Sequence, residues 1–214
     1  MRVTMVNSSL GSGGGERVMV TMANHWAARG WPVEIVTLAD EPSFYPLDPA
    51  VGHTRLGSRR ASGNPVRAVV ANARWLARLR AEIGASRPEV VVSFLTAVNV
   101  QTLLATRGSG TPVVVEEHSD PTIEAVHSVW RALRRATYPW AARVLVLSDV
   151  ARGYFPPAIR KNVGIMRNPI AVAPPGDVVR GARRQLVSMG RFTEEKGFDT
   201  LLDAFGRLAT DLPG

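Results

Sequence analysis

Short apolar runs alternate with helix-forming segments along most of this chain, and this alternation restricts the fold more than any other feature of the sequence. Strands are predicted at residues 3–6, 33–38, 53–56, 90–95, 113–116, 144–147 and 163–166. Helices are predicted among them at residues 16–29, 65–85, 97–105 and 129–141. Repeated strand–helix–strand units bury both faces of a parallel sheet. The sequence therefore predicts an α/β protein with a Rossmann-like, doubly wound parallel sheet.

A segment rich in proline and glycine separates this pattern from the end of the chain. Residues 171–183 follow no strand or helix periodicity, and their composition is typical of a linker between domains. A further apolar run, a polar loop and an amphipathic helix at residues 199–209 come next. One strand and one helix cannot enclose a core. We therefore expect a first domain at residues 1–170 and the start of a second Rossmann-like domain at residues 184–214.

The absence of cysteine from the 214 residues excludes disulfides, thiolate metal sites and cysteine nucleophiles. The first residues resemble a strand rather than a signal peptide, and no apolar run approaches the length of about 20 residues that spans a bilayer. The sequence therefore predicts a cytoplasmic protein. His25, His53 and His127 lack metal-ligand spacing and no Asp-x-Asp pair occurs, so no metal is expected.

The formal net charge of +8 comes mainly from arginine and favours an anionic partner. Phosphorylated small molecules and anionic membranes fit such a protein. Nucleic acid is not expected, because no helix-turn-helix, RNA-binding aromatic motif or zinc finger accompanies the charge. In the predicted helix 65–85, Arg67, Arg74 and Arg78 share one side and apolar residues another. This pattern is typical of a helix on anionic lipid, and equally of a solvated outer helix.

A glycine-rich turn at residues 11–15 follows the first predicted strand. Such a turn lets backbone N–H groups approach a phosphate at the start of the next helix. Gly11 and Gly13, with Asp40 after the second strand, fit part of a dinucleotide-binding fingerprint. The third glycine position of that fingerprint holds Glu16, whose carboxylate would lie beside the pyrophosphate. An oxidoreductase that binds a nicotinamide dinucleotide (NAD) therefore remains only an alternative.

A second strand-to-helix turn near the other end of the chain carries two cations. The apolar run at residues 185–190 predicts a strand, and Arg191 and Lys196 follow it before the helix at 199–209. A helix N-terminus at the end of a parallel strand is where α/β sheets bind anions. The sequence therefore predicts an anion site at this turn.

His118 lies among three carboxylates at the end of the strand predicted at residues 113–116. The carboxylates are Glu116, Glu117 and Asp120. Sites of parallel sheets form at the carboxyl ends of the strands, so His118 is a candidate catalytic residue, although a structural role is equally consistent with the sequence. Thr96 and Asn99 follow the preceding strand, where they either line the same site or cap the next helix.

The glycine-rich turn and the cationic turn, in this order, match two motifs of one enzyme family. Residues 13–18, Gly-Gly-Gly-Glu-Arg-Val, resemble the Gly-Gly-Ala-Glu-Arg-Val turn of retaining GT-B glycosyltransferases of family 4. Residues 190–198 resemble their Gly-Arg…Glu-Lys-Gly-Phe loop. Residues 44–48 and 91–95 are similar to the branch that adds N-acetylhexosamine or related sugars to lipid-linked glycans and to capsule or exopolysaccharide precursors. The resemblance covers the whole chain.

The resemblance implies a role for each matching residue. Arg191 and Lys196 would hold the diphosphate of the donor, and the backbone amides of Gly13 and Gly14 would approach the same phosphate. His118 matches an active-site histidine near the transferred sugar. The acceptor cleft would be lined by Gly15, Glu16, Thr96, Asn99 and Glu117.

The implied reaction transfers a sugar, N-acetylhexosamine or hexose, from a UDP- or GDP-linked donor to a lipid-linked or growing glycan. Retention of the anomeric configuration and independence of metal are implied with it. Polyprenyl-diphosphate acceptors reside in membranes, so Arg67, Arg74 and Arg78 are expected to face the inner side of the cell membrane. The family's donor-binding glutamates would lie further downstream, so little activity is expected of these residues alone. A non-catalytic membrane- or glycan-binding module is a second alternative.

Overall fold

The computed structural model describes residues 1–57, 65–118, 127–169, 186–190 and 192–211. The chain forms two compact units, Met1–Ile170 (unit 1) and Ala171–Gly214 (unit 2). The predicted linker at residues 171–183 lies outside the described residues. The assignment of unit 1 to acceptor binding and of unit 2 to donor binding stays a prediction.

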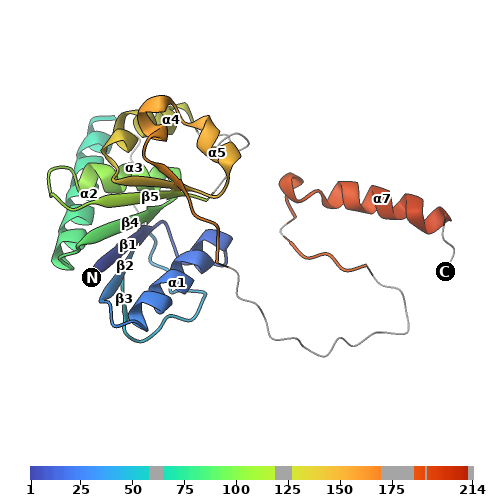
Figure 1. Ribbon diagram of the computed structural model, residues 1–214, viewed down its shortest axis with the longest axis horizontal. Helices are drawn as coiled ribbons and strands as arrows, with labels where there is room; N and C mark the ends of the chain where they lie inside the picture. Colours follow the sequence, from blue (N-terminus) through green and yellow to red (C-terminus); the bar gives the residue numbers. More distant parts are fainter. Residues whose placement is uncertain (58–64, 119–126, 170–185, 191, 212–214) are drawn as a thin grey trace. The chain divides into compact units, whose positions relative to one another are not determined.

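Unit 1 is built on a sheet of seven strands in the order β3-β2-β1-β4-β5-β6-β7, in which all neighbouring strands are parallel (Figure 1). The strands are β1 (Val3–Asn7), β2 (Val33–Thr37), β3 (Val51–Arg55), β4 (Val90–Phe94), β5 (Val113–Glu117), β6 (Arg143–Val146) and β7 (Val163–Ile165). From β1 the chain continues through β2 to the edge strand β3, and it then forms β4 on the other side of β1. Open α/β sheets bind ligands at such a switch point. The predicted Rossmann-like sheet is confirmed.

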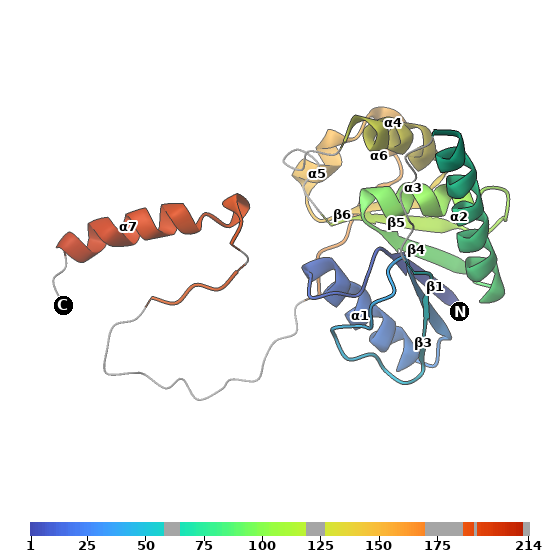
Figure 2. The ribbon, with the colours of Figure 1, turned by 180° about the vertical axis from the view of Figure 1, so that it is seen from behind.

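Both faces of the sheet are covered, which explains why the strands are nearly continuous runs of apolar residues. Ile35 and Val36 belong to different apolar clusters, because successive strand side chains point to opposite faces. The face that holds Ile35 packs against α1 (Gly14–Ala27). The other face carries the remaining helices of unit 1 (Figure 2). These are α2 (Pro65–Ala85), α3 (Thr96–Ala105), α4 (Ser128–Thr137), α5 (Asp149–Tyr154) and α6 (Pro157–Arg160), with the 3₁₀ turn η1 (Tyr138–Trp140).

The predicted strands and helices of unit 1 agree with the structure to within two residues at nearly every boundary. The exception is the helix predicted at residues 129–141, which ends at Thr137 and continues as η1. Pro139 explains this end, because proline has no N–H and its ring clashes with the preceding helical turn. The sequence did not predict α5 and α6, which are too short to show helical periodicity.

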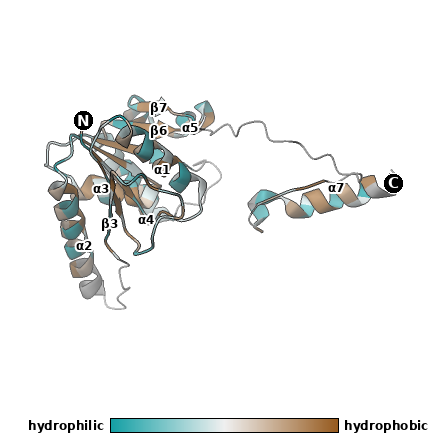
Figure 3. Ribbon diagram, turned by 90° about the horizontal axis from the view of Figure 1, so that it is seen from below, coloured by the Kyte–Doolittle hydropathy of each residue, from teal (hydrophilic) through white to brown (hydrophobic). Residues whose placement is uncertain are grey.

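Unit 2 contains the 3₁₀ turn η2 (Glu194–Lys196) and the helix α7 (Phe198–Asp211) among its described residues. The predicted helix is thus confirmed, but the strand predicted at residues 185–190 is wrong, because residues 186–190 form no strand and are exposed. A strand is stabilised by hydrogen bonds to a neighbouring strand, and the described part of unit 2 supplies none. Apolar residues recur at helical spacing along α7 and are exposed within this unit (Figure 3).

The basic helix α2 packs on the sheet through Leu79 and Ile83. Arg74 and Arg78 are exposed, as both interpretations of this helix require. The side chain of Arg67 lies outside the described residues, and Val70, an apolar residue of the same helix, is 45% exposed. Within the described ranges, no helix has both the length and the apolar character needed to cross a membrane.

Candidate active site at the carboxyl edge of the sheet

Three strand ends meet at the switch point, and each leads to a residue singled out from the sequence. β1 leads into the glycine-rich turn and α1, β4 leads into Thr96 at the start of α3, and β5 leads into His118. Because parallel strands all end at one edge of a sheet, the three connections converge there.

The first turn of α1 is open to a ligand. Gly13 is the N-cap and provides no side-chain cap, and both Gly13 and Gly14 are exposed. A Cβ at Gly14 would meet nothing within 4 Å, whereas one at Gly13 would collide with the carboxylate of Glu16. The first N–H groups of a helix lack intrahelical partners, and the helix dipole favours an anion beside them. The glycines predicted to bind phosphate therefore lie at an accessible helix N-terminus.

Tyr45, in the loop between β2 and β3, holds the glycine-rich turn in place. Its hydroxyl donates to the carbonyl of Ser12 at 2.9 Å and lies 3.3 Å from the carbonyl of Gly13. The neighbouring backbone N–H of Phe44 donates to the carbonyl of Leu10 at 2.8 Å. The sequence carries no signal for this role of Tyr45, because its two hydrogen-bond partners lie 33 and 32 positions earlier in the chain, beyond any local pattern.

His118 lies against the start of α1. Its ring stacks on Phe94, the last residue of β4, with the ring centroids 5.0 Å apart and the planes inclined by 13°. A Cβ at Gly15 would approach the His118 ring to 3.4 Å, so glycine at this position lets the helix come close to the ring. The side chain of His118 is only 7% exposed, and its Nε2 atom lies 3.2 Å from Oε1 of Glu116. The predicted catalytic histidine and the predicted phosphate-binding turn are therefore neighbours.

A buried polar network occupies the other face of the sheet, centred on Glu117 at the end of β5. The Glu117 carboxylate accepts hydrogen bonds from the Thr96 hydroxyl at 2.8 and 3.0 Å and from the Tyr138 hydroxyl. The Nη1 atom of Arg134 lies 3.7 Å from the same carboxylate. Burial, together with the charge of Glu117, raises the pKa of Tyr138 well above its usual value. The phenol therefore stays protonated and donates to the carboxylate.

Asn99 extends this network to the backbone of β5. Its side-chain amide donates to the carbonyl of Glu116 at 2.9 Å and to the Tyr138 hydroxyl at 3.0 Å. Its side-chain oxygen accepts a hydrogen bond from Ser93 at 2.8 Å. These bonds connect β4, α3, β5 and η1 in the interior of unit 1.

The structure places Thr96, Asn99 and Glu117, which were predicted to line the acceptor cleft, among buried groups, and their part in that cleft stays a prediction. The three residues are 8%, 0% and 2% exposed, and their side chains bond to other buried groups. The cause is strand alternation, since Glu117 points to the face that carries α3 and α4, whereas Glu116 points to the α1 face. The geometry therefore gives these three residues a structural role. Gly15 and Glu16 stay at the open edge.

Comparison with known proteins decides the family. Residues 12–176, more than half of the chain, match Glycosyltransferase Family 4. The chain belongs to glycosyltransferase family 4. The match includes Gly13, Gly14 and His118.

One curated relative of this chain is an enzyme of Campylobacter jejuni. It is 30% identical over 169 residues, which are 79% of this chain and 46% of the relative. Its name describes it as an α-1,4-N-acetyl-D-galactosaminyltransferase for GalNAc-α-(1→4)-GalNAc-α-(1→3)-diNAcBac-PP-undecaprenol. The chain thus spans about half the length of the curated relative that it matches.

Solved structures show the same fold at low sequence identity. Sucrose-phosphate synthase from Thermosynechococcus elongatus aligns with a TM-score of 0.58 at 12% identity, over 78% of this chain and 48% of that one. Anabaena HepE in complex with UDP and glucose aligns with a TM-score of 0.57 at 12% identity, over 78% of this chain and 44% of that one. These likenesses support the GT-B fold expected for this family 4 chain.

The dinucleotide-binding alternative fits this family 4 chain poorly. The side chain of Asp40, its candidate ribose ligand, is 76% exposed and lies 4.0 Å from Arg55. The Glu16 carboxylate lies over Gly13, at the turn where that class of protein binds a pyrophosphate. The dinucleotide-binding fingerprint requires a third glycine where Glu16 stands, so the turn departs from it.

The two predicted phosphate-binding cations belong to unit 2. Lys196 ends η2 and is exposed, and Gly197, with φ of 61°, forms the left-handed turn that leads into α7. Arg191 lies outside the described residues. Their role as diphosphate ligands stays a prediction. Where side chains are described, no group of three histidines or carboxylates could hold a metal ion.

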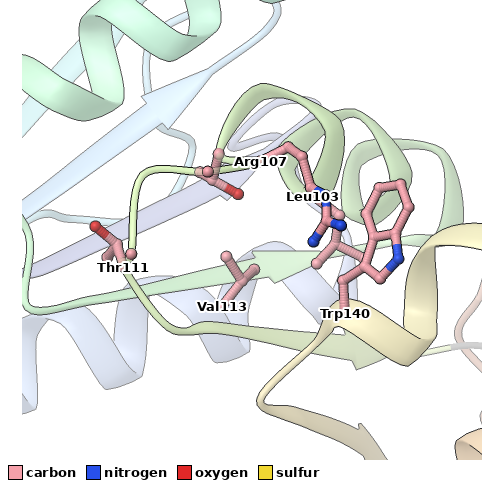
Figure 4. Close-up of a pocket in the computed structure, with 8 residues that line it drawn as sticks. Leu103, Arg107, Thr111, Val113 and Trp140 are labelled. Carbon is pink, nitrogen blue, oxygen red and sulfur yellow. The ribbon is translucent and has the colours of Figure 1, made fainter.

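A separate hollow of about 310 Å³ lies at the opposite, amino edge of the sheet, beside the first residue of β5 (Figure 4). Arg107 stacks over the ring of Trp140 at its rim, 4.4 Å from the ring centroid. None of the predicted site residues lines this hollow. The candidate active site is therefore the carboxyl edge.

Proposed function

We propose that unit 1 is the acceptor-binding domain of a glycosyltransferase that transfers a sugar from a nucleotide donor to a lipid-linked glycan. The observation that carries this proposal is the open N-terminus of α1 beside His118, at the switch point of a family 4 chain. The name of the Campylobacter relative describes transfer of N-acetylgalactosamine to an undecaprenyl-diphosphate-linked glycan. An N-acetylhexosamine donor and a polyprenyl-diphosphate-linked acceptor are proposed for this chain by analogy.

In this proposal, the backbone N–H groups of Gly13 and Gly14 approach the diphosphate of the donor. Negative charge grows on that diphosphate as the bond to the sugar breaks, and preorganised N–H donors stabilise it. Arg191 and Lys196 are proposed as further ligands of the same group. The donor is proposed to be UDP- or GDP-linked, the reaction to proceed without metal, and the anomeric configuration to be retained.

Replacement of His118 by alanine is expected to weaken acceptor binding about tenfold, because one lost hydrogen bond to a ligand costs about 1–1.5 kcal/mol. The probe is a short-chain polyprenyl-diphosphate-linked saccharide that ends in N-acetylgalactosamine, titrated into the protein by calorimetry. His25→Ala is the matched control, because His25 is exposed in the last turn of α1, away from the site. Equal loss in both variants, or no saturable binding by the unaltered protein, would refute the proposal.

We also propose that the arginines of α2 bring unit 1 into peripheral contact with the inner face of the cell membrane. Each basic residue near an anionic surface contributes about 1 kcal/mol of binding free energy. The triple variant Arg67→Ala/Arg74→Ala/Arg78→Ala is therefore expected to bind phosphatidylglycerol vesicles at least about tenfold more weakly. Co-sedimentation measures this, and the triple lysine variant, which keeps the charge, is the control. Unchanged binding of the alanine variant would show that these arginines do not face lipid.

A further inference from the structure

Glu116 is a buried carboxylate to which the proposed reaction assigns no role. It is 0% exposed, and neither of its oxygens accepts a hydrogen bond from any residue that the structure describes. It points to the α1 face of the sheet, away from the network around Glu117. A buried carboxylate without a donor is strongly unfavourable, so the group facing Glu116 determines how it is stabilised.

That group is the imidazole of His118. Its Nε2 atom lies 3.2 Å from Oε1 of Glu116, and Nε2 is itself buried with no other hydrogen-bond partner among the described residues. The two atoms are at hydrogen-bond distance but are not aligned for a hydrogen bond. Hydrogen bonds of active sites are often misaligned before a ligand binds. A proton on Nε2 satisfies both buried atoms with one bond.

One face of the ring is covered, and its Cγ–Cδ2 side lies close to the start of α1. Phe94 stacks on the His118 ring, and Gly15 approaches its Cγ–Cδ2 edge. Because Nε2 is turned toward Glu116, the nitrogen left for a ligand is Nδ1.

We propose that Glu116 is a positioning residue that holds His118 as the Nε2–H tautomer. Imidazole in this form has an unprotonated Nδ1, which accepts hydrogen bonds. His118 would then accept a hydrogen bond from a hydroxyl group of the saccharide bound at the carboxyl edge. The assignment of a saccharide as the ligand rests on the proposed function, whereas the tautomer does not.

The tautomer is measured by the nitrogen-15 chemical shifts of the ring at about pH 8, above the usual histidine pKa. The His118→Asn spectrum assigns the signals. Glu116→Met removes the acceptor and keeps the volume, and replacement of a buried charge by an apolar residue is often tolerated. Glu116→Gln keeps a carbonyl oxygen that can accept from Nε2–H. Glu41→Gln, at an exposed site, is the control.

We expect a protonated Nε2 in the unaltered protein, in Glu116→Gln and in Glu41→Gln, and a shift toward Nδ1–H in Glu116→Met. Saccharide binding is expected to weaken about tenfold in Glu116→Met and to be retained in Glu116→Gln. A dominant Nδ1–H form in the unaltered protein would overturn the proposal even if Glu116→Met did not fold. An unchanged tautomer in folded Glu116→Met would also overturn it. If the tautomers behave as expected but no saccharide binds, the proposed function fails and the role of Glu116 stands.

Discussion

Replacement of Glu117 by alanine is expected to lower the free energy of unfolding of unit 1 by about 3–5 kcal/mol. The carboxylate accepts hydrogen bonds from Thr96 and Tyr138 and lies 3.7 Å from Arg134, which is itself only 3% exposed. Removal of one partner leaves the guanidinium as a buried charge without its counterion. It also leaves two buried hydroxyls without their acceptor, and unsatisfied buried groups are costly. Urea denaturation, followed by far-UV circular dichroism, measures the loss.

Glu41→Ala is the matched control for Glu117→Ala. Glu41 is exposed, and surface substitutions change stability by about 0.5 kcal/mol or less. Tyr138→Phe removes two hydrogen bonds of the same network, the one that the hydroxyl donates to Glu117 and the one that it accepts from Asn99, and is expected to cost about 1–3 kcal/mol. If Glu117→Ala were no more destabilising than Glu41→Ala, the network would not contribute to stability as described.

The network around Glu117 also bears on the candidate site. It ties the end of β5 to α3 and η1 through Thr96, Asn99 and Tyr138. His118 is the next residue after β5. The His118 side chain, which faces the site, therefore follows a strand end that hydrogen bonds hold in place on the opposite face of the sheet.

The fold could be predicted from the sequence because its signals are local. Most strands of unit 1 are short apolar runs next to a helical pattern, and this periodicity depends only on neighbouring residues. The strand predicted at residues 185–190 shows the limit of the method, because a strand also requires a partner that local pattern does not provide. The short helices α5 and α6 were missed for the opposite reason, since they contain too few residues for a period.

The candidate site could be predicted only in part. The sequence located the glycine-rich turn and His118, because strand ends and glycines are visible in it. It could not tell which of Glu116 and Glu117 faces α1, because the predicted strand ended at residue 116 whereas β5 continues through Glu117. It also did not connect Tyr138 or Arg134 with Glu117, because these contacts join distant parts of the chain.

Replacement of Phe94 by alanine is expected to lower the free energy of unfolding of unit 1 by about 3–5 kcal/mol. The ring is fully buried in the apolar cluster under α1 and stacks on His118. The substitution removes the whole ring, and the surrounding close-packed core cannot collapse completely into the space. Urea denaturation measures the loss of stability.

The same substitution tests the support of His118. Without the aromatic neighbour, the ring-proton signals of His118 are expected to shift in the NMR spectrum, because the ring current of Phe94 is gone. Phe44→Ala is the control, since Phe44 is 67% exposed and packs edge-on against Tyr45, a contact worth about 0.5–1.5 kcal/mol. Equal loss of stability in the two variants, or unshifted His118 signals in Phe94→Ala, would contradict the described packing. A large loss confined to Phe94→Ala, with shifted His118 signals, would tie the core under α1 directly to the position of the candidate catalytic ring.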